Sequence, residues 1–358
     1  MRAMEFILLY QLFQEVYLMH RRNWFIDNLK GISCILVVFL HCQFPGMFGK
    51  IMEALSRIAV PFFFASAGFF AAKASQVQLF KRIKSVCKMI VIAAIFYIPY
   101  SCYYEIYMGY VDTFKEYFYK YFNLIGVAEL LLLNNSQGIA YHLWFLFALL
   151  YCYLIFAFLK NRNKSIVIIS FILLAIGYFS RIIILALNRF DVFSISTSVI
   201  YCRNWLLLGL PCFLLGTYSY VNTRRMDASK AVPMIIGGMI LCILERFVIY
   251  NTFRGGLEIY IGTILQLVGI LEIAKQYEMK SVNILQVLGE KYSSLIYLMH
   301  VGVIYFVDIL AKRYKILFEG SIGYLKPLVV LEVTLLLCYI VKKVEANIMC
   351  RKNMKTIQ

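Results

Sequence analysis

The chain has 358 residues, of which 62% are hydrophobic and only 15% are charged. Soluble domains carry about 45–50% apolar and about 25% charged residues, so one soluble core cannot bury this much apolar surface. The net charge of +17 is what Lys and Arg residues in cytoplasmic loops would produce. Because no RNA- or DNA-binding signature is present, we expect membrane lipid, and no nucleic acid, as a partner.

Ten apolar segments follow one another along the chain, each near the ~20 residues that a helix needs to cross a bilayer. Residues 1–22 precede them, and their apolar residues interrupted by Gln and Glu predict an interfacial helix. We predict an all-α integral membrane protein with a transmembrane domain at 23–343 and a basic cytoplasmic tail at 344–358. The predicted spans are 26–44, 54–72, 86–104, 141–159, 165–187, 201–220, 231–250, 257–275, 292–311 and 324–341.

The loops between these spans are short except for residues 105–140, where many Tyr and Phe residues predict a re-entrant or interfacial helix. With the N-terminus in the cytoplasm, 23 of the 36 Lys and Arg residues fall on the cytoplasmic side. This bias favours both termini inside and hence an even number of spans. The loop at 312–323, which carries Lys312, Arg313 and Lys315, breaks the trend.

The first predicted span carries three residues that can do chemistry, namely Asp27, Lys30 and His41. Ionisable residues inside a span are costly and are functional candidates by default. Lys30 and His41 are eleven residues apart, which is three helical turns plus ~20°, so both point the same way, ~16 Å apart along the axis. Asp27 lies one turn before Lys30 and can pair with it. One helix face therefore presents a cation near the cytoplasm and a titratable base in the outer half.

His41 and three other candidate residues, His142, Trp144 and His300, also have a plainer, structural interpretation. His41 can be a histidine that is hydrogen-bonded to a neighbouring helix, and His300 can be a core residue. For His142 and Trp144, at the start of the fourth span, interfacial anchoring is the favoured interpretation because Trp is enriched at membrane interfaces. Some further charges in or near spans should line a polar cavity, although the sequence does not pair them: Arg57, Arg181, Arg203, Glu245, Arg246 and Glu332.

A family resemblance adds context to these residues. The stretch WFIDNLKGI at 24–32, with a basic residue and a histidine separated by ten residues, resembles the opening of the acyltransferase-3 family of membrane O-acyltransferases. Further stretches are similar to the family in the same order, so that the resemblance covers roughly residues 21–341. They are RIAVPFFF at 57–64 with GFF at 68–70, HLWFL at 142–146, GLPCF at 209–213 with Gly216, and Gly289 with SSLIYLMH at 293–300.

The resemblance implies transfer of an acyl group, usually acetyl, from coenzyme A in the cytoplasm to a hydroxyl of an envelope sugar. It implies His41 as general base, a role in which a positioned histidine increases the rate about 10²–10⁴-fold. We expect Lys30 and Asp27 to belong to the same catalytic set, with Lys30 binding coenzyme A. For the phosphates of acetyl-CoA, or of another acyl-CoA, we expect Lys81, Arg82, Lys84 and Lys88. For the acceptor pocket we expect Arg57, Ser66, His142, Trp144, Tyr297 and His300. We predict no metal site.

Two departures from the family pattern bear on these expectations. The family has Ser directly before the glycine of the second span, whereas here Ala67 occupies that position and Ser66 lies one residue earlier. The family also favours an Arg-x-x-Arg pair before the third span, where this chain has Lys81-Arg82-Ile83-Lys84-Ser85. Lys keeps the charge but acts as a point charge, so bidentate binding of phosphate by a second Arg is in doubt.

The leading hypothesis is therefore an acyl-CoA-dependent O-acyltransferase in a bacterial-type plasma membrane, acting on a cell-surface glycan or its lipid-linked precursor. The main alternative is a multi-pass transporter of a small solute or envelope precursor. A receptor or scaffold that kept the fold and lost catalysis is a third hypothesis. Against the transporter, the two halves of the chain lack a matched pair of broken helices, a sign of inverted repeats. No oligomeric state is predicted.

Overall fold

The computed structural model describes residues 23–158, 165–189, 201–253, 255–276, 283–316, 318 and 322–355, and the predicted extension at 1–22 lies outside these ranges. The described ranges contain helices and loops and no strand. The longer helices are α2 (Trp24–His41), α3 (Gly46–Ser56), α4 (Ala59–Ala72), α5 (Gln76–Met108), α8 (Trp144–Phe158), α9 (Ser165–Arg189), α10 (Leu210–Val221), α11 (Ala228–Phe253), α12 (Ile261–Ala274), α14 (Ser293–Tyr314) and α15 (Leu325–Lys355).

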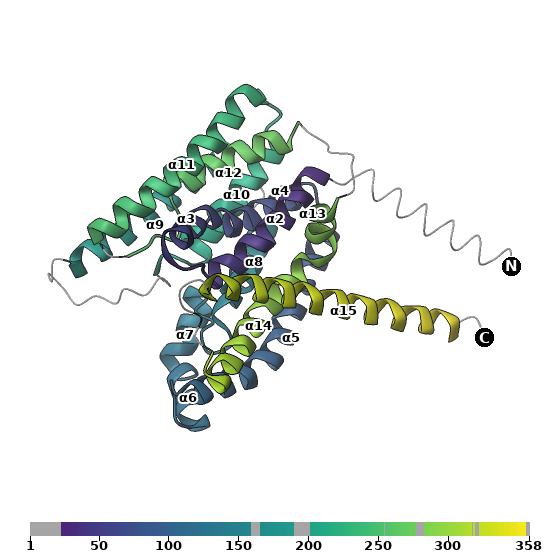
Figure 1. Ribbon diagram of the computed structural model, residues 1–358. Coiled ribbons are helices and arrows are strands. Elements are labelled where there is room, and N and C mark those ends of the chain that lie inside the picture. The colour runs from purple at the N-terminus through teal and green to yellow at the C-terminus, as the bar shows by residue number, and fades with distance from the viewer. Residues whose placement is uncertain are drawn as a thin grey trace.

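Short helices connect or extend the long ones. They are α6 (Phe114–Tyr121), α7 (Leu124–Leu133), α13 (Ile284–Val287), the 3₁₀ turns η1 (Tyr141–Leu143) and η5 (Ile322–Tyr324), and the π-helical turns η3 (Trp205–Gly209) and η4 (Leu288–Tyr292). In Figure 1, α2, α4 and α8 occupy the middle of the molecule. On one flank lie α9, α11 and α12, and on the other lie α5 and α14 with the α6–α7 pair at their ends.

The two ends of the bundle can be told apart by contacts between distant residues. At the end where α2 begins, the Asn23 amide donates to the Ala274 carbonyl at the end of α12 (2.6 Å). At the other end, the Phe44 ring lies 6.4 Å from that of Tyr324, just before α15. We name these the proximal side, where α2 begins, and the distal side, where α2 ends.

All ten segments predicted to span the membrane contain helix. Within the described ranges, eight helical segments are long and apolar enough to cross a bilayer, with the α3–α4 pair counting as one. The other two, Trp205–Val221 and Ile261–Ala274, are shorter. At ~1.5 Å per residue α12 is only ~21 Å long, and it runs back along α11 through the close pairs Gly238–Gly262 and Ala231–Gly269. The protein is a multi-pass, all-α membrane protein in which two of the predicted segments form helices shorter than the rest.

Several boundaries differ from the predicted ones. The helix α5 begins at Gln76, ten residues before the predicted span at 86–104, and ends at Met108. Residues 105–140 hold two short helices, α6 and α7, in place of one. Their N-caps, Thr113 and Asn123, each accept a hydrogen bond from a backbone N–H of the following turn, which is how such side chains start a helix. At the other end of the chain, α15 continues to Lys355, so no break separates the transmembrane domain from the predicted tail at 344–358.

Small residues allow the central helices to approach each other closely, as is common in membranes. A Cβ atom added at Gly31 of α2 would lie 2.0 Å from the Leu285 carbonyl oxygen, and one added at Gly289 would lie 1.8 Å from that of Asp27. These two contacts lock α2 against α13 and η4. They also flank Lys30, so packing fixes the height of this residue in the bundle.

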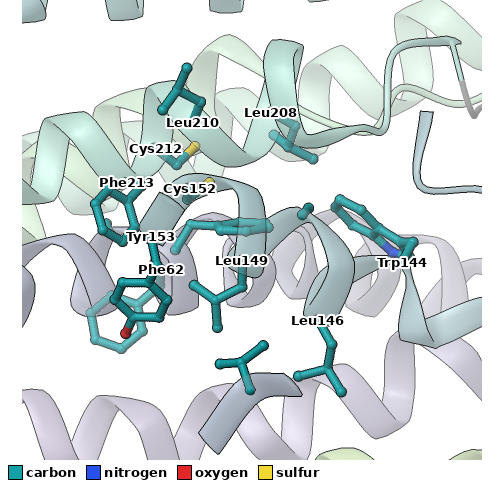
Figure 2. Packing of buried hydrophobic residues seen from close by; sticks show 14 of the residues in the cluster. Phe62, Trp144, Leu146, Leu149, Cys152, Tyr153, Leu208, Leu210, Cys212 and Phe213 are labelled. Carbon is teal, nitrogen blue, oxygen red and sulfur yellow. The ribbon is translucent and has the colours of Figure 1, made fainter. Parts of the chain in front are cut away.

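The main core lies between α4, α8 and α10. Figure 2 shows Cys152 of α8 next to Cys212 of α10, with Trp144 and Tyr153 on opposite sides of the labelled group. Cys152, Cys212 and Phe213 are fully buried. Because α8 is held by this packing, the ring of Trp144 has a fixed position at the distal end of the core.

Candidate functional site

The proximal half of α2 presents an ion pair. The Asn23 side chain caps the helix by accepting from the Ile26 N–H (3.1 Å), which places Asp27 in the first turn. The Lys30 ammonium lies 3.3 Å from the Asp27 carboxylate and 4.5 Å from the centre of the Phe70 ring. The predicted pairing of Asp27 with Lys30 is confirmed.

Lys30 lies at one end of a proximal cavity of about 320 Å³. The walls of this cavity come from α2, α4, α5, α8 and α14. Half of its lining residues carry a polar group, but apolar atoms form most of its surface. The lining residues include Lys30, Phe63, Ser66, Arg82, Phe145, Ser293, Ser294 and Tyr297.

The basic residues at the start of α5 do not act as one cluster. Arg82 lines the proximal cavity, whereas the side chains of Lys81, Lys84 and Lys88 are exposed. The reason is helical geometry, because positions 81, 84 and 88 share one helix face and 82 points elsewhere. Of the four residues expected to hold coenzyme phosphates, the structure brings only Arg82 to the cavity.

The distal end of α2 brings His41 into a group of three histidines. The ring of His300 from α14 lies 5.2 Å from that of His41 and 5.0 Å from that of His142. Tyr141 adds a fourth ring, 5.1 Å from His41. Residues from three distant parts of the chain therefore converge, although the sequence placed them on separate spans.

His300 has a defined orientation. Its Nδ1 atom lies 3.1 Å from the Ile296 carbonyl oxygen, and since a carbonyl can only accept, Nδ1 donates. In the neutral ring Nε2 then carries the lone pair, and among the described residues this buried atom has no hydrogen-bond partner. The two ring nitrogens of His142 are likewise buried without a partner in that part of the chain.

Tyr97 of α5 holds α14 beside this group. Its hydroxyl donates to the Leu298 carbonyl (2.6 Å) and accepts from the Gly302 N–H (2.9 Å). These two groups are four residues apart and belong to one turn of α14. The Tyr97 ring also lies 5.2 Å from that of His142. Tyr97, which the sequence did not single out, therefore positions the backbone on both sides of His300.

His41 also lines a second, distal cavity of about 100 Å³. Unlike the proximal cavity, this one is rich in charge. Its walls are formed by Leu40, His41, Arg57, Val60, Trp144, Arg203, Leu208 and Glu258. Trp144 is buried at 5% exposure, and its ring lies 5.6 Å from the Arg203 guanidinium carbon. The favoured interpretation of Trp144 and His142 as interfacial anchors is wrong, because both side chains are buried inside the bundle.

A buried network of ion pairs supports the distal cavity. Arg57 donates to Glu53 through Nη2 (2.7 Å) and to Glu258 through Nη1 (3.0 Å). Arg246 pairs with the other oxygen of Glu53. Burial alone would raise the pKa of Glu258, but the charges of Arg57, Arg203 and neighbouring Arg181 outweigh it and lower that pKa. Glu258 is therefore a carboxylate in the folded protein.

Two of the other charges noted in the sequence have separate partners, whereas Glu332 is exposed on α15 and lines neither cavity. Glu245 accepts from the N–H groups of Ile261 and Gly262 at the start of α12. Arg181 donates to the Gly256 carbonyl (3.2 Å) beside the network. Sequence reasoning missed Glu258, which lies in the loop between α11 and α12, because nothing local marks it as facing Arg57.

Two residues expected in the acceptor pocket lie elsewhere. Ser66 lines the proximal cavity and donates to the Phe63 carbonyl (3.0 Å), so it is on the Lys30 side and not beside His41. Tyr297 also lines the proximal cavity, while its hydroxyl donates to the His142 carbonyl (2.6 Å). It therefore lies between the proximal cavity and the histidine group.

The two cavities follow the same three helices. On α2, Lys30 lines the proximal cavity and His41 the distal one. On α4 the corresponding residues are Phe63 and Val60, and on α8 Phe145 and Trp144. Since Lys30 and His41 are ~16 Å apart along the axis of α2, the cavities are stacked along the helices, one nearer each side of the bundle.

The comparisons with known proteins identify the family. The acyltransferase domain family model matches residues 23–342. No curated protein and no solved structure matches the chain. Among the described residues, no group of three or more His, Cys, Asp or Glu side chains is placed to hold a metal ion. The chain belongs to the acyltransferase-3 family, and it is a membrane acyltransferase.

Proposed function

We propose that the protein transfers an acyl group, acetyl by our expectation, from acyl-CoA to a hydroxyl of a cell-surface glycan or its lipid-linked precursor. One observation carries this proposal. A cavity with Lys30 and Arg82 and a cavity with His41 are stacked along α2, α4 and α8. A donor with an anionic head and a reactive far end suits this arrangement.

The donor would enter from the proximal side. The excess of Lys and Arg residues in the proximal loops supports a cytoplasmic location for that side, in a bacterial-type plasma membrane. Lys30 and Arg82 provide two cations for the coenzyme phosphates, and charge-assisted contacts of this kind are among the stronger hydrogen bonds. The mostly apolar cavity beyond them suits the slender, uncharged arm that carries the thioester.

His41 would act as the general base. A hydroxyl is a poor nucleophile until a base takes its proton during attack on the thioester carbonyl. His41 lines the small distal cavity, and His142 and His300 form a second row of imidazoles behind it. The acceptor would reach His41 from the distal side, where Arg57, Trp144 and Glu258 surround the same space.

Family membership favours this enzyme over a transporter, since the whole matched region is an acyltransferase domain. The test uses membranes that contain the full chain and acetyl-CoA labelled in the acetyl group. We expect label to move to a glycan or glycolipid fraction, and His41→Ala to lower the rate about 10²–10⁴-fold with the amount of folded protein unchanged.

The control is Lys230→Ala, an exposed residue on the proximal side of α11, which should keep full activity. Full activity of His41→Ala would overturn the assignment of the base. Transport of an unmodified solute without any acyl transfer would overturn the proposed function itself.

A further inference from the structure

Arg203 is held in the distal cavity by a long ion pair and by an aromatic ring. It lies just before η3 and lines the cavity together with His41. Its contact with Glu258 is an ion pair at 3.9 Å, beyond hydrogen-bond distance. Its Nε atom is buried, and among the described residues that atom has no hydrogen-bond partner.

Arg57, the other arginine of this cavity, is different. Its Nε and Nη2 atoms both donate to Glu53 (3.1 and 2.7 Å), and its Nη1 atom donates to Glu258 (3.0 Å). Every nitrogen of Arg57 is engaged in the network, and its charge is balanced there. Arg203 shares Glu258 with Arg57 and lies farther from it, so its own charge is only partly balanced, and its side chain lines the cavity.

The backbone around Arg203 is held in place. Asn204, which is 4% exposed, caps the following turn by accepting from the N–H groups of Leu206 and Leu207. The Trp205 N–H donates to the side chain of Asn134 (3.0 Å), a fully buried residue at the end of α7. The Trp144 ring packs against the guanidinium. Arg203 therefore occupies a preorganised position and is not a mobile surface side chain.

Acyl transfer needs such a group. The acceptor oxygen bonds to the thioester carbon while His41 takes the hydroxyl proton, and the carbonyl electron pair moves onto oxygen. The C–S bond then breaks, the carbonyl re-forms, and the leaving thiolate receives the proton from His41. Between these steps the carbonyl oxygen is an anion, and preorganised donors aimed at this charge lower the barrier.

We propose that Arg203 is a second catalytic residue, which donates hydrogen bonds to the oxyanion that forms on the thioester carbonyl when the hydroxyl attacks. The inference rests on the proposed function. A cavity of about 100 Å³ shared by base and guanidinium leaves room for the reacting atoms and little else. Glu258 keeps Arg203 oriented without using up its donors.

The test is steady-state kinetics of Arg203→Ala and Arg203→Lys with acetyl-CoA and the acceptor glycan fraction. We expect Arg203→Ala to lower kcat about 10²–10³-fold, the loss typical of a missing oxyanion donor, with KM for acetyl-CoA and for the acceptor nearly unchanged. Arg203→Lys should keep part of the rate because it keeps a charge but not the planar donors. Added guanidinium ion should restore part of the Arg203→Ala rate, which it would not do for a purely structural defect.

The matched control is Arg189→Ala, an exposed arginine at the distal end of α9, which should leave kcat unchanged. If Arg203→Ala raises KM for the acceptor at constant kcat, Arg203 binds the acceptor and the proposal is wrong. If Arg203→Ala is as active as wild type, the proposal is also wrong. Where Arg203→Ala does not fold, Arg203→Gln and Arg203→Lys provide the same comparison. A wild-type protein that transfers no acyl group would instead overturn the proposed function.

Discussion

The two cavities of this protein lie on the same three helices and are chemically opposite. The proximal cavity is larger, has a mostly apolar surface, and is lined by two cations, Lys30 and Arg82. The distal cavity is smaller and is walled by His41, Arg57, Arg203 and Glu258. A long uncharged arm with an anionic head needs length and few charges, whereas developing charge at a reacting carbonyl needs fixed donors. The difference therefore matches a division between holding a donor and carrying out the transfer.

The same contrast appears in the ion pairs. On the proximal side, Asp27 and Lys30 pair within one helix, and the Lys30 side chain is 20% exposed. On the distal side, Glu53 is 4% exposed and joins Arg57 to Arg246, so that α3 and α11 are connected through buried charge. The proximal pair can respond to a ligand, whereas the distal network is part of what holds the helices together.

The largest effect should come from breaking that network. Glu53→Gln removes one charge and leaves Arg57 and Arg246 buried without their shared partner, a change that typically costs about 3–5 kcal/mol. We expect a strongly lowered melting temperature for the detergent-solubilised protein. Glu345→Gln is the control, because that carboxylate is 48% exposed and pairs with Lys342 on the same helix, where pairs contribute about 0–1 kcal/mol. Equal melting temperatures for the two variants would contradict a structural role of the distal network.

A smaller effect is expected at the proximal cavity. Arg82→Ala should raise KM for acyl-CoA about 10–150-fold, since a lost hydrogen bond to a charged group costs about 1.5–3 kcal/mol, while kcat changes little. Lys230→Ala should leave both parameters unchanged. An unaltered KM in Arg82→Ala would show that the cavity does not hold the coenzyme phosphates, and the comparison of the two cavities would then lose its donor side.

The smallest effect concerns the pH dependence of stability. Because the pKa of Glu258 is lowered by folding from its ordinary value of 4.5, the stabilisation is complete above that value and is lost as the pH falls below it. Melting temperatures measured between pH 7 and 3.5 should therefore fall less steeply for Glu258→Gln than for wild type. Parallel curves would mean that Glu258 adds no pH-dependent stability to the distal network.

Local pattern was enough to predict the helices but not their lengths. Apolar runs located all ten segments, because a bilayer requires about 20 such residues of any helix that crosses it alone. The apolar pattern could not predict that α10 and α12 are shorter. Most residues of these two helices are buried against other helices, and such a helix need not match the thickness of the lipid. Helical periodicity placed Asp27 beside Lys30, a contact within one turn that depends on no other part of the chain.

The sequence by itself determined a multi-pass membrane protein of the acyltransferase-3 family, with Lys30 and His41 on one face of its first helix. Only the tertiary structure decided which residues share a site with them. It brought His142 and His300 to His41, separated Arg82 from Lys81, Lys84 and Lys88, and set Arg203 and Glu258 around the distal cavity. The physical reason is the sequence separation of the residues that make contact. Spacing within a helix fixes neighbours three or four residues apart, whereas these groups come from helices that meet only through packing, at contacts such as Gly31 with Leu285.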